Sequence, residues 1–90
     1  MSGAERASLI EYPSLFPIKV MGANHPDFER TVVEIATRFD PAYDPHTLQR
    51  RASGAGNYVG LTLIINATSR QQLDDLYRSL SSHPLIKVVL

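Results

Sequence analysis

The side chains with the greatest capacity for acid–base or metal chemistry are three histidines. His25, His46 and His83 each stand beside a proline, in predicted connections between secondary-structure elements. A metal site needs several converging ligands supported by further hydrogen bonds, and no predicted helix carries two ligands four residues apart. The chain has no cysteine, which removes disulfides, thiolate metal sites and cysteine nucleophiles. We therefore predict no metal site and no cofactor.

A glycine-rich run, Gly54-Ala55-Gly56-Asn57, resembles a phosphate-binding loop only superficially. Loops that bind phosphate place their amides at the start of a helix, whereas a strand pattern follows this run. We interpret it as a hairpin turn. The serines and threonines show no nucleophile-elbow motif. Asp74 and Asp75 are adjacent and would diverge on a helix, so no catalytic residue is predicted.

Basic residues offer a different chemistry, the binding of an anion or a partner's carboxylate. Arg50 and Arg51 alternate across a predicted strand, so only one of them can face a given ligand. Charge that protects an edge strand is the competing interpretation. Lys19, Lys87 and Val89 are predicted to lie on one open sheet face as a candidate interface, where solvated lysines are the alternative.

Composition excludes several functional classes. The 90 residues include 9 basic and 9 acidic side chains, and zero net charge argues against binding nucleic acid by counterion release. No apolar run approaches about 18 residues, so no membrane span is predicted. Residues 1–10 lack the apolar core of a signal peptide. We expect a cytoplasmic protein with a flexible N-terminus over 1–10 and a single domain over 11–90.

Hydrophobic periodicity predicts six elements in the order strand, helix, strand, strand, helix, strand. Asn24 or His25 is expected to cap the first helix, with Pro26 in its first turn. Ser69 with Gln72 matches a capping box for the second helix. The predicted strands cover 16–21, 47–53, 58–65 and 85–90, and the apolar stripes of the two helices cover 28–39 and 73–80.

This order of elements predicts an α+β fold, the ferredoxin-like βαββαβ two-layer sandwich. Right-handed crossovers give an antiparallel sheet of order 4-1-3-2 with both helices on one face. The face covered by the helices is predicted to carry Phe16, Ile18, Val20, Val59, Leu61, Leu63, Ile65, Ile86 and Val88. The open face is predicted to carry Lys19, Met21, Tyr58, Thr62, Ile64, Lys87 and Val89.

In this topology, three connections should share one end of the molecule. They are the loop after the first strand, the hairpin turn and the connection into the last strand. Gly22 would allow close backbone approach, and the helix start would offer unpaired amides to a carboxylate or phosphate. The candidate ligand-binding residues are Gly22, Asn24, His25, Gly56, Asn57 and His83.

Several segments resemble the YbeD-like family of small bacterial proteins. They are Phe16-Pro17-Ile18-Lys19-Val20-Met21-Gly22, Gly56-Asn57-Tyr58, Ile64-Ile65-Asn66-Ala67-Thr68 and the closing Ile86-Lys87-Val88-Val89-Leu90. The resemblance covers nearly the whole chain. It implies a fold similar to the ACT regulatory domains, which bind small effectors by the loop after the first strand. It also implies an undescribed biochemical role, with a suggested link to lipoate metabolism that rests on the resemblance alone.

These observations favour a non-catalytic regulatory or adaptor module that binds a partner protein or a small anionic metabolite. A small enzyme that uses the His25/His83 end is the alternative. An RNA-binding sheet shares this topology, but it needs exposed aromatic residues on its central strands, where only Tyr58 is available. The apolar last strand, with Lys87 as its single charge, also predicts a weak homodimer through its edge or the open face.

Overall fold

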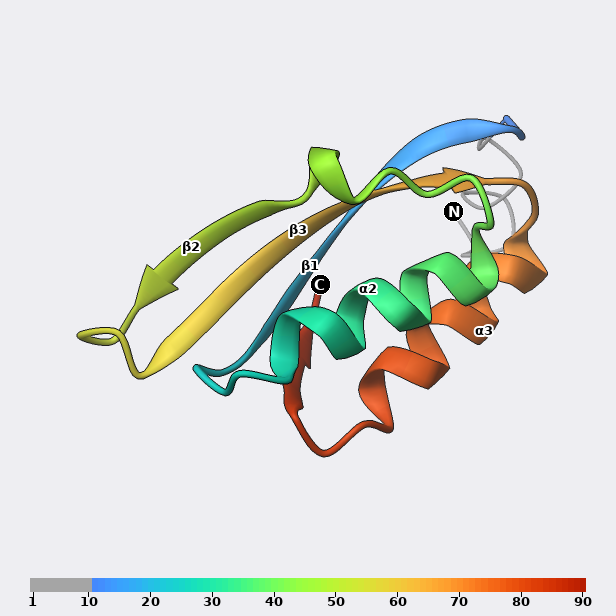
Figure 1. Ribbon diagram of the computed structural model, residues 1–90. Coiled ribbons are helices and arrows are strands. Elements are labelled where there is room, and N and C mark those ends of the chain that lie inside the picture. The colour runs from blue at the N-terminus through green and yellow to red at the C-terminus, as the bar shows by residue number, and fades with distance from the viewer. Residues whose placement is uncertain (1–10) are drawn as a thin grey trace, which may run out of the picture.

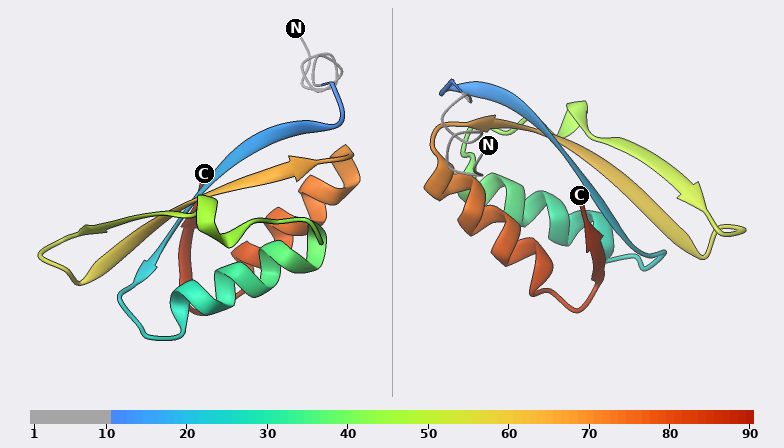
Figure 2. Two further views of the ribbon diagram at one scale, coloured as in Figure 1. Left: turned by 45° about the horizontal axis from the view of Figure 1, so that its top comes forward. Right: turned by 180° about the vertical axis from the view of Figure 1, so that it is seen from behind.

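A computed structural model describes residues 11–90, so the expected flexibility of 1–10 lies outside the described residues. One layer is an antiparallel sheet of order β2-β3-β1-β4, and two helices form the other layer on one of its faces (Figures 1 and 2). The predicted ferredoxin-like fold is thereby confirmed. The elements are β1 (Ser14–Ala23), α2 (Phe28–Phe39), η1 (Pro45–Thr47), β2 (Gln49–Ser53), β3 (Tyr58–Ala67), α3 (Arg70–Ser81) and β4 (Ile86–Val89).

The centre of the sheet is the long ladder between β1 and β3, which runs from Ser14 opposite Ala67 to Ala23 opposite Tyr58. Alternate residues of both strands point toward the helices. Ile18 and Leu63 face each other in this ladder and are completely buried. The buried strand residues meet the apolar stripes of the helices, chiefly Phe28, Val32, Ile35, Leu73, Leu76 and Leu80.

Pro17 lies within β1, although proline cannot donate to a strand ladder. The N–H and C=O of Lys19 both bond to Leu90, so the polar groups of Lys19 point to the β4 side. Pro17 is two residues earlier, so its nitrogen points to the same side of the strand. β4 pairs with β1 only from Lys19 onward, so no described strand lies beside Pro17 on this side. No donor is needed there, so the strand tolerates the proline.

The last strand departs from its predicted faces. Val20 pairs with Val89 and Met21 with Val88, but Gly22 pairs with Ile86, so Lys87 is the extra residue of a β-bulge. A single inserted residue exchanges the faces beyond it. The prediction that Val88 is buried and Val89 open is therefore wrong. Val88 is 43% exposed, and Val89 packs against the core.

The starts of α2 and β2 also differ from the prediction. Helix α2 begins at Phe28 with Asp27 at the N-cap, and the Asp27 side chain makes no capping bond. Asn24 cannot cap this helix because its side chain bonds to the hairpin turn instead. β2 begins at Gln49, since the Asp44 carboxylate accepts the His46 N–H and caps the short η1 turn.

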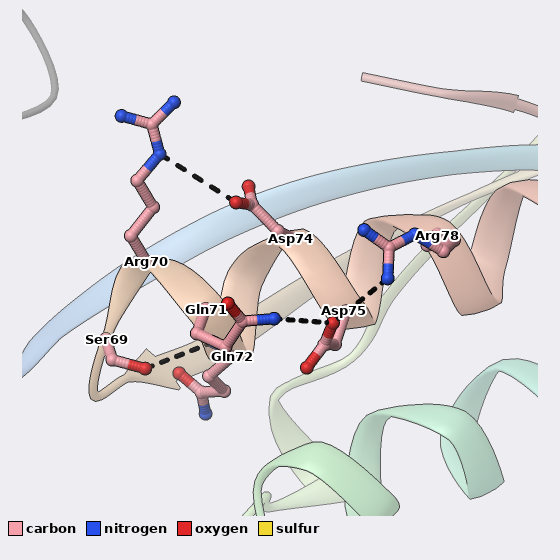
Figure 3. A network of polar contacts seen from close by, with 7 residues as sticks. All are labelled: Ser69, Arg70, Gln71, Gln72, Asp74, Asp75 and Arg78. Atoms are coloured by element: carbon pink, nitrogen blue, oxygen red, sulfur yellow. Dashed lines mark hydrogen bonds and ion pairs between the residues drawn. The ribbon is translucent and has the colours of Figure 1, made fainter. Parts of the chain in front are cut away.

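Helix α3 starts as the sequence predicts, with the Ser69 Oγ accepting the Gln72 N–H at 3.1 Å (Figure 3). The Gln72 side chain does not complete the predicted capping box, because it bonds to the residue before the N-cap rather than to the Ser69 N–H. Its Oε1 accepts the Thr68 N–H, while its Nε2 donates to the carbonyls of Phe39 and Asn66. One amide side chain thus ties together the ends of α2, β3 and α3.

Asp40 is the one buried charged residue in the described part of the chain. Its Oδ2 accepts the Asn66 N–H at 3.0 Å, and its Oδ1 accepts the Ala42 N–H. The carboxylate therefore closes the edge of β3 beyond Gln49, the first residue of β2. Within residues 11–90, no helix is both long and apolar enough to cross a membrane.

Candidate functional site

At the predicted end of the molecule, the loop after β1 meets the turn between β2 and β3. The Asn24 N–H donates to the Asn57 carbonyl at 3.0 Å, and the Asn24 Nδ2 donates to the Gly56 carbonyl at 2.9 Å. Arg50 reaches the same place, with its guanidinium 3.4 Å from the Asn24 Oδ1 and 4.0 Å from the Glu29 carboxylate. These contacts join the loop after β1 to the hairpin between β2 and β3.

The hairpin turn has the backbone that its glycines predict. Gly54, Ala55 and Gly56 all have positive φ angles, of 59°, 56° and 85°. A side chain at Gly54 would also collide with the ring of Tyr58, whose Cδ2 lies 2.8 Å from the position of a Cβ. The run is therefore a turn whose glycines serve backbone geometry and ring packing.

The two histidines near this end use the same ring nitrogen in the same way. The Nδ1 of His25 accepts the Asp27 N–H at 3.0 Å, and the Nδ1 of His83 accepts the Leu85 N–H at 3.2 Å. Each ring thus stabilises its own turn, and only its Nε2 remains for other contacts. His46 lies apart from them in η1, where it bonds to Asp44.

Gly22 is buried, and the space beside it is already occupied. A Cβ at this position would collide with the Leu85 carbonyl and lie 2.5 Å from the ring of Phe28. Gly22 therefore serves the close packing of β1 against α2 and the start of β4. The binding of an anion by this end stays a prediction, which an NMR titration with small carboxylates and phosphates can test through the amides of Asn24 and Asn57.

The open face of the sheet carries the exposed apolar side chains. By strand alternation and register, all four of the large hydrophobic residues that are strongly exposed within residues 11–90 lie on this face. They are Leu15 (74% exposed), Tyr58 (52%), Val88 (43%) and Leu90 (66%). The helix layer lies entirely on the other side of the sheet, so nothing in the described chain covers them (Figure 2).

Two rows of side chains cross this face and enclose a shallow hollow of about 500 Å³. One row is Arg51–Gly60–Met21–Val88, and the next is Gln49–Thr62–Lys19–Leu90. Gly60 has no side chain and forms the floor of the hollow. Arg51 stands on one side of this floor and Lys19 on the other, two strands apart, which is about 10 Å across a sheet.

The charges of the molecule are divided between its two layers. The four strands contain Lys19, Arg50, Arg51 and Lys87 but no acidic residue. The arginines of α3 are neutralised within the helix, where Arg70 pairs with Asp74 and Arg78 with Asp75 (Figure 3). Lys19 and Arg51 have no acidic partner within 4.0 Å among the described residues. The hollow is therefore a cationic site with an apolar border.

Comparison with known proteins tests the family resemblance that the strand motifs indicate. Residues 7–90 match the family described as "Protein of unknown function (DUF493)". The chain belongs to this family. A UPF0250 protein of Leptothrix cholodnii is 64% identical over 92% of this chain and 91% of its own length. UPF0250 proteins of Bordetella parapertussis and Ralstonia nicotianae are 58% and 56% identical over similar shares. The YbeD-like resemblance is thereby confirmed.

The sequence of this DUF493 chain did not reveal the hollow, because the residues that line it come from different strands. The sequence predicts that Lys19, Met21 and Thr62 lie on the open face, but it does not say whether Arg50 or Arg51 lies there with them. The structure turns Arg50 toward Asn24 and leaves Arg51 beside Gly60. One signal was present in the sequence, namely the absence of acidic residues from all four predicted strands. Within residues 11–90, no three potential metal ligands lie together.

Proposed function

We propose that this chain is a cytoplasmic, non-catalytic adaptor or regulatory module that binds a partner protein through the open face of its sheet. The observation that carries this proposal is the gathering of Leu15, Tyr58, Val88 and Leu90 on one uncovered face. Leu15 and Tyr58 stand at opposite ends of the β1–β3 ladder, and Pro17, Met21 and Ile64 lie between them on the same face. Apolar surface that extends along one face of a sheet marks a site of protein association. The engagement of both histidine Nδ1 atoms in turns supports a role without catalysis.

Site-specific photo-crosslinking in cells tests this proposal. A photoreactive residue replaces Tyr58 or Val88 on the open face in one set of strains, and Arg38 or Thr37 on the helix layer in the control set. All four positions are exposed, so replacing them preserves the core. We expect discrete crosslinked species from the open-face positions only. Crosslinks that arise equally from the helix positions, or from neither set, would contradict the proposal.

A further inference from the structure

We infer that the hollow over Gly60 binds an acidic side chain, an aspartate or glutamate within an apolar segment of the partner protein. This inference rests on the proposed function and names the chemistry of its contact. Lys19 and Arg51 flank the hollow without acidic partners among the described residues. An arginine fork can hold a carboxylate by two parallel hydrogen bonds, and a lysine adds a third charged donor.

The glycine makes room for such a group. The Cβ position of Gly60 lies 3.7 Å from the Arg51 carbonyl and 3.9 Å from the Cγ of Met21, which are ordinary contacts. The fold therefore does not require a glycine here. Its lack of a side chain opens the sheet surface at the point toward which the two cationic side chains can converge.

The border of the hollow identifies the ligand as part of a protein. Leu90 lines the hollow, Val88 lies outside it opposite Met21, and both are exposed. A small metabolite seated over Gly60 would leave this apolar edge uncovered, whereas a peptide segment can extend across it. Apolar contact supplies most of the association energy in such complexes, and the buried charge pair adds specificity.

A second copy of this chain fits the open face poorly. Two open faces packed together would bring Lys19 and Arg51 of one copy against those of the other, with no carboxylate from any strand to compensate. Like charges brought together across an interface disfavour association. The occupant must instead supply acidic side chains, which the strands of this protein lack.

Selection from a random peptide library displayed on phage tests the inference with the full chain as bait. We expect enriched peptides that combine Asp or Glu with neighbouring aliphatic or aromatic residues. A synthetic copy of one such peptide, with its acidic residue changed to the matching amide, should bind at least about tenfold more weakly. That factor corresponds to 1.4 kcal/mol, the scale of one charge-assisted contact.

Variants of the protein then locate the contact. Lys19→Gln, Arg51→Gln and Gly60→Val should each weaken binding of the acidic peptide by about tenfold or more. Arg38→Gln is the matched control, because Arg38 is an exposed arginine on α2 without an acidic partner among the described residues. It should change the affinity less than about twofold. Gly60→Val should retain or raise the melting temperature, since valine suits a strand and its Cβ fits.

The outcomes separate this inference from the proposed function. Enriched peptides that lack acidic residues and lose binding with Leu90→Ser but not with Arg51→Gln would overturn the carboxylate contact and retain the open face as a docking surface. Peptides that bind Gly60→Val, Arg51→Gln and Leu90→Ser as tightly as the wild-type chain would overturn the inference at this face. A selection that enriches nothing would also count against it.

Discussion

Gly22 and Gly60 lie on neighbouring strands of one sheet, yet the same substitution should have opposite effects at the two positions. A methyl group at Gly22 meets the Leu85 carbonyl and the ring of Phe28, whereas at Gly60 it makes only ordinary contacts. We expect Gly22→Ala to lower the free energy of unfolding by about 1–3 kcal/mol through overpacking. Gly60→Ala should raise it by about 0.5–1 kcal/mol, because glycine weakens a strand interior.

Denaturant unfolding of both variants beside the wild-type chain measures this difference. Equal losses at the two positions would contradict the assignment of Gly60 to an open hollow.

Tyr43 gives the molecule a dependence on alkaline pH. Burial of its phenol raises the pKa of Tyr43, and the neighbouring carboxylates of Asp44 and Glu29 raise it further. In the unfolded chain, the phenol of Tyr43 ionises near pH 10, which is about the ordinary pKa of tyrosine. Because the folded pKa is higher, its stabilising contribution is complete below about pH 10 and is lost as the pH rises toward the folded pKa.

Thermal unfolding between neutral and alkaline pH measures the contribution of Tyr43. Tyr43→Phe should lose less stability above about pH 10 than the wild-type chain does. Tyr58→Phe, at a half-exposed position on the open face, is the control. An alkaline loss that is the same in Tyr43→Phe as in the wild-type chain would show that Tyr43 ionises without cost in the fold.

At the scale of elements, the central ladder sets the stability of the sandwich. Leu63 is completely buried between the sheet and the helices, while its neighbour Ile64 points to the open face. We expect Leu63→Ala to cost about 2–5 kcal/mol, because it opens a cavity. Ile64→Ala should cost clearly less. Chemical denaturation compares the two variants, and a loss below about 1 kcal/mol at Leu63 would mean that the register of β3 is inverted.

The bulge at Lys87 decides which valine of β4 supports the core. Val89 packs against the buried cluster, whereas Val88 faces solvent opposite Met21. Val89→Ala should therefore lower the free energy of unfolding by about 1 kcal/mol or more, and Val88→Ala should change it by less than about 0.5 kcal/mol. The same denaturation experiment measures both variants. The reverse order would show that β4 pairs with β1 without a bulge.

At the scale of the whole molecule, the helix layer and the sheet layer differ in how their charged side chains are paired. The arginines of α3 are paired with acidic residues of the same helix, whereas, among the described residues, the sheet layer carries the unpaired cations Lys19 and Arg51 beside exposed apolar groups. The β2–β3 hairpin extends beyond the N-terminal start of α2 (Figure 1), and every residue of β2 is exposed. A partner at the open face would therefore meet a broad surface whose charge is of one sign.

The charge of this surface also indicates which of the two predicted dimer interfaces is favoured, the open face or the edge of β4. Open faces that meet would repel through Lys19 and Arg51, while an edge-to-edge contact of β4 keeps these groups apart. We expect a weak homodimer through the free edge of β4, which Lys87 alone protects by charge. Light scattering at millimolar protein measures it, and Lys87→Glu, which keeps one charge on each edge, is the matched variant. A chain that stays monomeric at this concentration would contradict the prediction.

The order of elements, the faces of β1 and β3 and the Ser69 cap follow from the sequence by itself. These features depend on local patterns: the period of the apolar residues and a side chain that bonds three residues ahead. The meeting of Asn24 with Asn57 was also predictable, because right-handed crossovers leave one arrangement of the four strands.

Tertiary structure alone decided the faces of Val88 and Val89, the choice between Arg50 and Arg51, and the hollow over Gly60. Each depends on which residues of different strands stand opposite one another, and local periodicity carries no information about that pairing. The extra residue at Lys87 has no distinctive signature in an apolar run. A hollow arises only where a glycine on one strand lies between long side chains on two others, which cross-strand register alone brings about.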